Sequence, residues 1–113
     1  AQAAECAKEQ GKFWEMHNKI YDEQAKLGQG TVPFSNDDLK KWGSEIGLNS
    51  QKFNQCVDSE KYAPEVEKDF QDGVAAGVTG TPTFFIGNPK DGYTGIVGAQ
   101  PYSVIKQAID SLL

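Results

Sequence analysis

Apolar residues recur at helical spacing through the first two-thirds of the chain. Intervals of three and four residues separate Phe13, Met16 and Ile20, and the same spacing returns within residues 39–46. Side chains at these intervals lie on one face of an α-helix. Residues 1–10 are strong helix formers with no capping residue before them, so we expect the chain to begin inside a helix of a longer protein.

Capping residues indicate where the other helices begin and end. After a predicted loop over residues 28–33, Ser35 and the acidic residues behind it suit a helix start, and Gly47 suits a helix end. Asn49 is a candidate cap for the next helix, and Pro64 fits only in the first turn of the one after it. The apolar positions predicted to face inward on these helices are Leu39, Trp42, Ile46, Phe53, Cys56, Val57, Tyr62, Val66 and Phe70.

The pattern changes after the glycines at positions 73 and 77. Thr83–Ile86 and Tyr93–Gly98 are short runs rich in β-branched and aromatic residues, and a turn sequence over residues 88–92 separates them. This order predicts a β-hairpin. Pro101 suits the first turn of a last helix. The residues of that helix predicted to face the core are Val104, Ile105, Ala108, Ile109 and Leu112.

Composition and charge narrow the function classes. The chain has 113 residues, suits one domain, and carries a formal net charge of −5 with its lysines interspersed among acidic residues. A nucleic-acid-binding protein should show a basic stripe, so we expect no nucleic-acid partner. No apolar run approaches the length of about 18 residues that a transmembrane helix needs. We expect no cofactor, and no metal site, because Cys6, His17 and Cys56 lack a fourth ligand and a zinc-type spacing.

Several segments resemble a known family. The run GVTGTP at Gly77–Pro82, followed by an aromatic strand, resembles the cis-proline loop of the thioredoxin superfamily. Ala4–His17 and Phe53–Ser59 resemble the helical insertion of bacterial DsbA-like proteins, and Gly98–Tyr102 resembles the entry to their final helix. The resemblance covers almost the whole chain in the order and spacing of the family.

The resemblance implies a thioredoxin-like α/β fold of the DsbA type, truncated at its N-terminus. Residues 1–76 would form the helical insertion, and residues 77–113 the C-terminal part of the thioredoxin fold. The implied function is part of an exported, periplasmic or extracytoplasmic thiol–disulfide oxidoreductase, with cysteine-containing protein substrates and a redox partner protein. The family's CxxC is missing from this sequence, so no catalytic residue is assigned. The alternative is a redox-inactive, peptide-binding or chaperone-like module.

The same resemblance assigns roles in the loop. Thr81 would offer backbone groups to an extended substrate peptide, and Pro82 would line the active site. Val78, Gly80 and Thr83 would support the loop. The competing interpretation is an ordinary turn before a strand with a trans Thr81–Pro82 bond, since most X–Pro bonds are trans.

Cys6 and Cys56 lie 50 positions apart on separate predicted helices. Some DsbA-like relatives carry a second disulfide at such positions, so a structural Cys6–Cys56 disulfide is one interpretation, and two buried free thiols are another. A catalytic dithiol is disfavoured because packed helices do not give the exposed helix-terminal setting that a reactive thiolate needs. We expect His17 to be a packing residue, and the aromatic residues to belong to the core rather than to a peptide-binding stripe; these are Phe13, Trp14, Trp42, Phe53 and Phe70.

The strand Thr83–Ile86 has a further implication. In thioredoxin folds it pairs with a strand that the family places before the insertion. Without that neighbour the strand would be an open apolar edge, which pairs readily with other chains. We therefore expect a dimer, a domain swap or a retained companion fragment.

Overall fold

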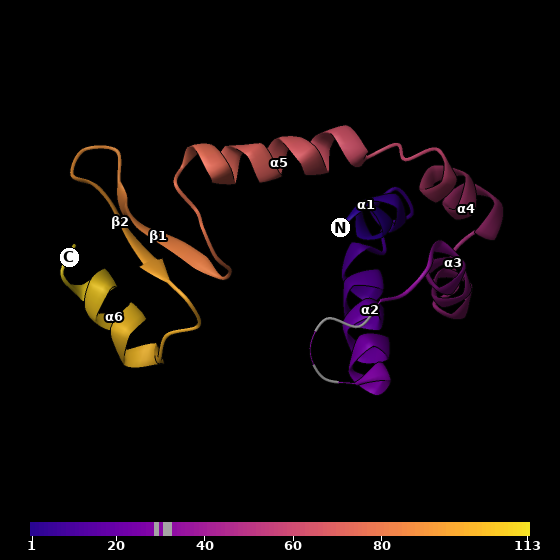
Figure 1. The fold of residues 1–113 in the computed structure, drawn as a ribbon, viewed down its shortest axis with the longest axis horizontal. Helices are drawn as coiled ribbons and strands as arrows, with labels where there is room; N and C mark the ends of the chain where they lie inside the picture. The colour runs from indigo at the N-terminus through magenta and orange to yellow at the C-terminus, as the bar shows by residue number, and fades with distance from the viewer. Residues whose placement is uncertain (29, 31–32) are drawn as a thin grey trace. The chain divides into compact units, whose positions relative to one another are not determined.

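Six helices and two strands make up the chain over residues 1–28, 30 and 33–113, the part that this computed structural model describes (Figure 1). The predicted loop over residues 28–33 falls partly on residues 29, 31 and 32, which lie outside the described part. The elements are α1 (Gln2–Lys8), α2 (Phe13–Leu27), α3 (Asn36–Glu45), α4 (Ser50–Asp58), α5 (Ala63–Ala75), β1 (Thr83–Asn88), β2 (Gly92–Val97) and α6 (Tyr102–Asp110).

The chain divides into two compact units, residues 1–69 and residues 70–113, with α5 shared between them. Unit 1 contains α1 to α4, and unit 2 contains the hairpin and α6. The predicted division between residues 76 and 77 stays a prediction. The order of helices followed by a hairpin and a last helix confirms the secondary structure that the sequence pattern predicts.

The predicted caps form with the expected atoms. The Asp38 N–H donates to Ser35 Oγ at 3.2 Å, and the Ser35 N–H donates to Asp38 Oδ2 at 2.9 Å, which is a capping box at the start of α3. Asn49 Oδ1 accepts from the Lys52 N–H at 3.0 Å at the start of α4. Gly47 has φ of +83°, and the Leu48 N–H donates to the Gly43 carbonyl, so α3 ends in a Schellman motif that requires the left-handed residue.

The core of unit 1 lies where α1 to α4 meet. Its largest fully buried side chain is Phe53 of α4, which is 1% exposed, and Met16 of α2 and Trp42 of α3 pack in the same cluster. Trp42 and Phe53 therefore confirm the prediction of core aromatics. Removing such side chains from water is the main favourable term in folding a domain of this size.

For two other aromatic residues the prediction of a core position is wrong. Trp14 is 66% exposed and Phe70 is 63% exposed. Trp14 follows Phe13 on α2, and a rotation of about 100° per residue carries it away from the face that holds Met16. Its ring instead stands edge-on to Phe13 at 5.1 Å. Phe70 lies where α5 passes out of unit 1, and it belongs to unit 2, which has no buried core.

Gly43 is required by a close approach in this core. A Cβ atom at this position would lie 2.6 Å from Cε1 of the Phe53 ring. Because Phe53 is enclosed, its ring cannot move aside freely, and overpacking of this kind costs about 1–3 kcal/mol. We predict that Gly43→Ala lowers the urea midpoint of unit 1, whereas Gly80→Ala does not lower it, since Gly80 lies in unit 2 and its Cβ would meet nothing within 4 Å.

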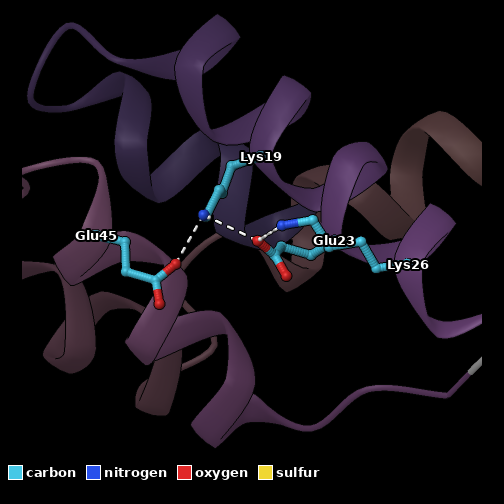
Figure 2. Close-up of polar contacts among 4 residues, drawn as sticks. All are labelled: Lys19, Glu23, Lys26 and Glu45. Atoms are coloured by element: carbon cyan, nitrogen blue, oxygen red, sulfur yellow. Dashed lines mark hydrogen bonds and ion pairs between the residues drawn. The ribbon is translucent and has the colours of Figure 1, made fainter.

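An ion-pair network joins α2 to α3 (Figure 2). Lys19 Nζ lies 3.0 Å from Glu23 Oε1 on its own helix and 2.7 Å from Glu45 Oε2 on α3. Lys26 Nζ lies 2.9 Å from the same Glu23 oxygen. The hydrogen bonds from Lys26 and Lys19 hold the pKa of Glu23 below its ordinary value of 4.5.

This shift predicts a pH dependence. A lowered folded-state pKa means that the carboxylate stabilises the fold above pH 4.5, and that this contribution is lost as the pH falls through the folded-state value. We expect the urea midpoint of unit 1 to fall less between pH 6 and pH 3 in Glu23→Gln than in the wild type. The control is Glu15→Gln, an exposed position on the same helix, which should keep the wild-type pH profile.

In unit 2, β1 and β2 pair antiparallel with Thr83 opposite Val97 and Asn88 opposite Gly92. The turn is closed by Asn88 Oδ1, which accepts from the N–H groups of Lys90 and Asp91, both at 2.9 Å. The structure describes all of residues 70–113, and no side chain among them is buried. The apolar positions predicted to face a core in the last helix are half-buried at Ile105 and Ala108 and exposed at Val104, Ile109 and Leu112, of which Leu112 follows the end of α6. One hairpin and one helix have too little apolar surface to enclose these side chains.

Candidate functional site

The candidate site is the loop that joins α5 to β1. It starts at a Schellman motif: Gly77 has φ of +84°, and the Val78 N–H donates to the Gly73 carbonyl at 3.0 Å. This cap ends α5 and directs the chain toward β1. Of the two glycines after which the sequence pattern changes, Gly77 is the left-handed residue of this cap, and Gly73 lies within α5 and accepts its hydrogen bond.

Two hydrogen bonds hold the far end of the loop. The Thr83 hydroxyl donates to the Gly80 carbonyl at 2.5 Å, and the Gly98 N–H donates to the Pro82 carbonyl at 2.7 Å. The Thr81–Pro82 peptide bond between them is cis. The loop is thus tied to itself and to the end of β2.

The five residues predicted for this site lie close together in the sequence, between positions 78 and 83, and they differ in exposure. Thr81 and Pro82 are exposed, whereas Val78, Gly80 and Thr83 are half-buried. No hydrogen bond within the described residues engages the main-chain N–H or C=O of Thr81. Residues 76–83 carry no ionisable side chain. The loop therefore leaves the Thr81 backbone groups unpaired and offers no acid, base or thiolate side chain.

The structure joins Cys6 to Cys56 in a disulfide, with the sulfur atoms 2.11 Å and the Cα atoms 5.8 Å apart. The bond links α1 to α4 inside the core of unit 1. The interpretation as two free thiols does not describe this structure, and a disulfide between two packed helices differs from a dithiol at an exposed helix end.

His17 is half-buried among aromatic rings, with its ring centroid 5.2 Å from that of Trp14 and 4.9 Å from that of Tyr21. Its Nδ1 lies 3.0 Å from Asn18 Oδ1. These contacts are those of a packing residue. Within the described residues, no group of three or more His, Cys, Asp or Glu side chains is placed to hold a metal ion.

A polar cavity in unit 1 was not predicted from the sequence. It has a volume of about 460 Å³ and lies in unit 1 between the α1–α2 turn and α4, with Cys56 in its wall. Its polar lining residues come from positions about 40 to 50 apart in the sequence and follow no motif.

Comparison with known proteins gives one family match and several partial relatives. The family model described as "DSBA-like thioredoxin domain" matches residues 1–110. The curated relatives are Na(+)/H(+) antiporters. NhaA 3 of Salinispora tropica is 33% identical over 86 residues, which is 76% of this chain and 12% of the relative. NhaA of Herminiimonas arsenicoxydans is 33% identical over 86 residues, covering 76% of this chain and 13% of the relative.

NhaA 1 of Mycolicibacterium vanbaalenii is 33% identical over 88 residues, again 76% of this chain and 13% of the relative. The chain therefore spans about one-eighth of the length of the curated relatives it matches. The names of those relatives refer to whole proteins, and most of each protein lies outside the match. Among the described helices, none is both long enough and apolar enough to cross a bilayer. No solved structure matches the chain significantly.

Proposed function

This chain belongs to the family of DSBA-like thioredoxin domains, and on this basis we propose that it is part of an exported thiol–disulfide oxidoreductase that forms or isomerises protein disulfide bonds. In this proposal residues 1–76 are the helical insertion and residues 77–113 the C-terminal part of the thioredoxin fold. The antiport named for the relatives is not proposed, because the match covers only 12–14% of those proteins.

The observation that carries the proposal is the exposed residue Thr81, two positions before β1, whose backbone groups have no hydrogen-bond partner among the described residues. An extended peptide can add its own backbone hydrogen bonds at such a place, as in β-augmentation. Binding through backbone groups tolerates many side chains, which suits an enzyme that acts on many protein substrates. Thr81 and Pro82 would contact the substrate, and Val78, Gly80 and Thr83 would hold the loop in shape.

The redox chemistry itself requires a second pair of cysteines. Both cysteines of this chain are used in one disulfide, and the sequence has no CxxC. A substrate thiolate would attack one sulfur of a CxxC disulfide supplied from outside these 113 residues. A second substrate thiolate would then attack the mixed disulfide, so that the substrate is oxidised and the CxxC pair is reduced. A redox partner protein would reoxidise that pair. The Cys6–Cys56 disulfide supports an extracytoplasmic, periplasmic location, since such bonds persist in oxidising compartments.

The loop is tested by titrating the isotopically labelled chain with an extended, cysteine-free peptide and recording amide chemical shifts. We expect shifts at residues 78–83 and not at residues 35–45 of α3. Thr83→Val removes the hydroxyl that donates to Gly80, so binding should weaken relative to Thr94→Val, a matched change on the exposed strand β2. Unchanged loop amides at saturating peptide would overturn the proposed role.

The alternative function is a redox-inactive, peptide-binding or chaperone-like module. The absence of a CxxC in the sequence favours it for this chain in isolation. An insulin-reduction assay distinguishes the oxidoreductase from the redox-inactive module. The chain alone should give no turnover above a dithiothreitol control, whereas a polypeptide that supplies a CxxC beside the loop should give turnover. Activity of the chain alone would contradict the assignment of the redox step to cysteines outside it.

We also propose that β1 is an edge through which two copies pair or exchange strands. Among the described residues β1 is paired only with β2, and its other edge is open over Thr83–Ile86. Sedimentation velocity should show a concentration-dependent dimer. Phe85→Lys places a charge on this edge and should give a monomer, whereas Lys90→Ala in the turn should not. A wild-type chain that stays monomeric at every concentration would refute the dimer.

A further inference from the structure

A polar cavity in unit 1 lies against Cys56, one of the two cysteines of the disulfide. It is formed by the end of α1 and the turn after it, by α4, and by the residues that follow α4. The cavity holds about 460 Å³, and its lining residues are Glu9, Gln10, Lys52, Gln55, Cys56, Ser59 and Lys61. All of them belong to unit 1, so the cavity is a feature of this unit by itself.

The two cysteines of the disulfide differ in their contact with this cavity. Cys56 lies in the cavity wall and is 6% exposed. Cys6 does not line the cavity, is 2% exposed, and packs in the core with Ala3 and Ala7 of its own helix. A thiolate that attacks a disulfide must reach one sulfur directly, so access favours attack at Cys56.

The charges around the cavity indicate which thiols it would accept. Lys52 and Lys61 contribute two ammonium groups, and Glu9 contributes one carboxylate. Lys61 Nζ lies 2.6 Å from Glu9 Oε2, and this hydrogen bond raises the pKa of Lys61 above its ordinary value of 10.5, so Lys61 is charged at neutral pH. No hydrogen bond or ion pair within the described residues occupies the Lys52 ammonium. The cavity is thus locally positive in a chain whose net charge is −5.

We propose that Cys56 is a thiol-exchange site, at which a small thiol bearing carboxylates, of the glutathione class, opens the Cys6–Cys56 disulfide and remains attached as a mixed disulfide. The thiolate of the incoming molecule attacks Cys56 Sγ and forms a new S–S bond. The Cys6–Cys56 bond breaks, and Cys6 leaves as a thiolate that takes a proton from water. Attack of the Cys6 thiolate on Cys56 reverses the step and releases the small thiol. Ammonium groups of Lys52 and Lys61 attract the carboxylates.

Non-covalent contacts keep the two cysteines close after the bond opens. Gln10 and Asn49 form a reciprocal pair, with Gln10 Nε2 donating to the Asn49 carbonyl at 3.3 Å and the Asn49 N–H donating to Gln10 Oε1 at 2.7 Å. Lys12 Nζ donates to the Ile46 carbonyl at 2.9 Å. These contacts, together with the Lys61–Glu9 pair, join the end of α1 to α3 and α4. The opened form therefore retains the fold, and the disulfide can close again.

The test uses the oxidised wild-type chain and needs no variant for its first result. The chain is incubated with reduced glutathione, quenched with acid, alkylated and mapped by mass spectrometry. We expect glutathione on Cys56 and the alkyl group on Cys6. Glutathione found mainly on Cys6, or equally on both, would overturn the proposal, as would a chain that reacts only in denaturant.

The charge contribution is tested by kinetics with two probe thiols. Two charges about 4 Å apart interact by about 1 kcal/mol in water. Neutralising either lysine should therefore lower the rate of the reaction with glutathione by about three- to fivefold. Lys52→Gln and Lys61→Gln should show this loss with glutathione and no change with uncharged 2-mercaptoethanol. Lys41→Gln, an exposed lysine of unit 1 outside the cavity, should behave as wild type. Equal rates for all variants with glutathione would refute the recognition of an anionic thiol.

Discussion

Replacing Phe53 by alanine should destabilise unit 1 by about 3–5 kcal/mol, the largest effect that we expect from a single substitution in this chain. The side chain is 1% exposed, and it lies at the centre of the cluster formed by α1 to α4. Truncation removes its buried area and leaves a cavity that the disulfide and the surrounding helices prevent from collapsing fully. Because domains are stable by only about 5–15 kcal/mol, the variant could lose most of its folded population.

Urea unfolding followed by the fluorescence of Trp42 measures this effect, since Trp42 is buried in the same cluster. The matched control is Phe70→Ala. Phe70 is 63% exposed, so we expect its replacement to change the midpoint for unit 1 by less than about 0.5 kcal/mol. Similar losses in the two variants would contradict the placement of the core.

Removing the disulfide with Cys6→Ala and Cys56→Ala together should destabilise unit 1 by about 2–4 kcal/mol. The bond closes a loop of 50 residues, for which the chain-entropy model gives about 4 kcal/mol as an upper figure. The double substitution leaves no unpaired thiol and keeps both positions small and apolar, so the loss reports the cross-link.

The measurement is again urea unfolding of unit 1, comparing the double variant with the oxidised wild type and with wild type in excess reductant. The reduced wild type and the variant should have similar midpoints, both below the oxidised protein. The helical circular dichroism without urea should be retained, because the contacts of Gln10 with Asn49 and of Lys12 with Ile46 remain. Equal midpoints in all three samples would show that the cross-link does not constrain the unfolded chain.

The candidate site could be predicted from residues that are close in the sequence. The five site residues are neighbours in the chain, so their proximity follows from the sequence, whereas the roles assigned to Thr81 and Thr83 stay predictions. The cavity at Cys56 could not be predicted. Its walls come from the end of α1 and from α4, and their approach depends on how the four helices pack.

The sequence by itself determined the order of the elements and several of their ends. The capping box at Ser35, the cap at Asn49 and the left-handed glycines Gly47 and Gly77 depend on residues within one helical turn, so short-range chemistry is sufficient. The family resemblance, which rests on other segments such as Ala4–His17 and Gly77–Pro82, is confirmed by the match over residues 1–110.

Only the tertiary structure decided which apolar faces are buried. The stripes on α4 and on α6 have the same helical spacing, yet Phe53 is enclosed and Ile109 is exposed. Spacing determines which side chains share a face, but burial requires other elements with enough apolar surface to cover that face. Unit 1 has four helices and a disulfide around its centre, and unit 2 has one hairpin and one helix with no enclosed side chain. The same long-range packing buried both cysteines and placed Cys56, but not Cys6, in the wall of a cavity.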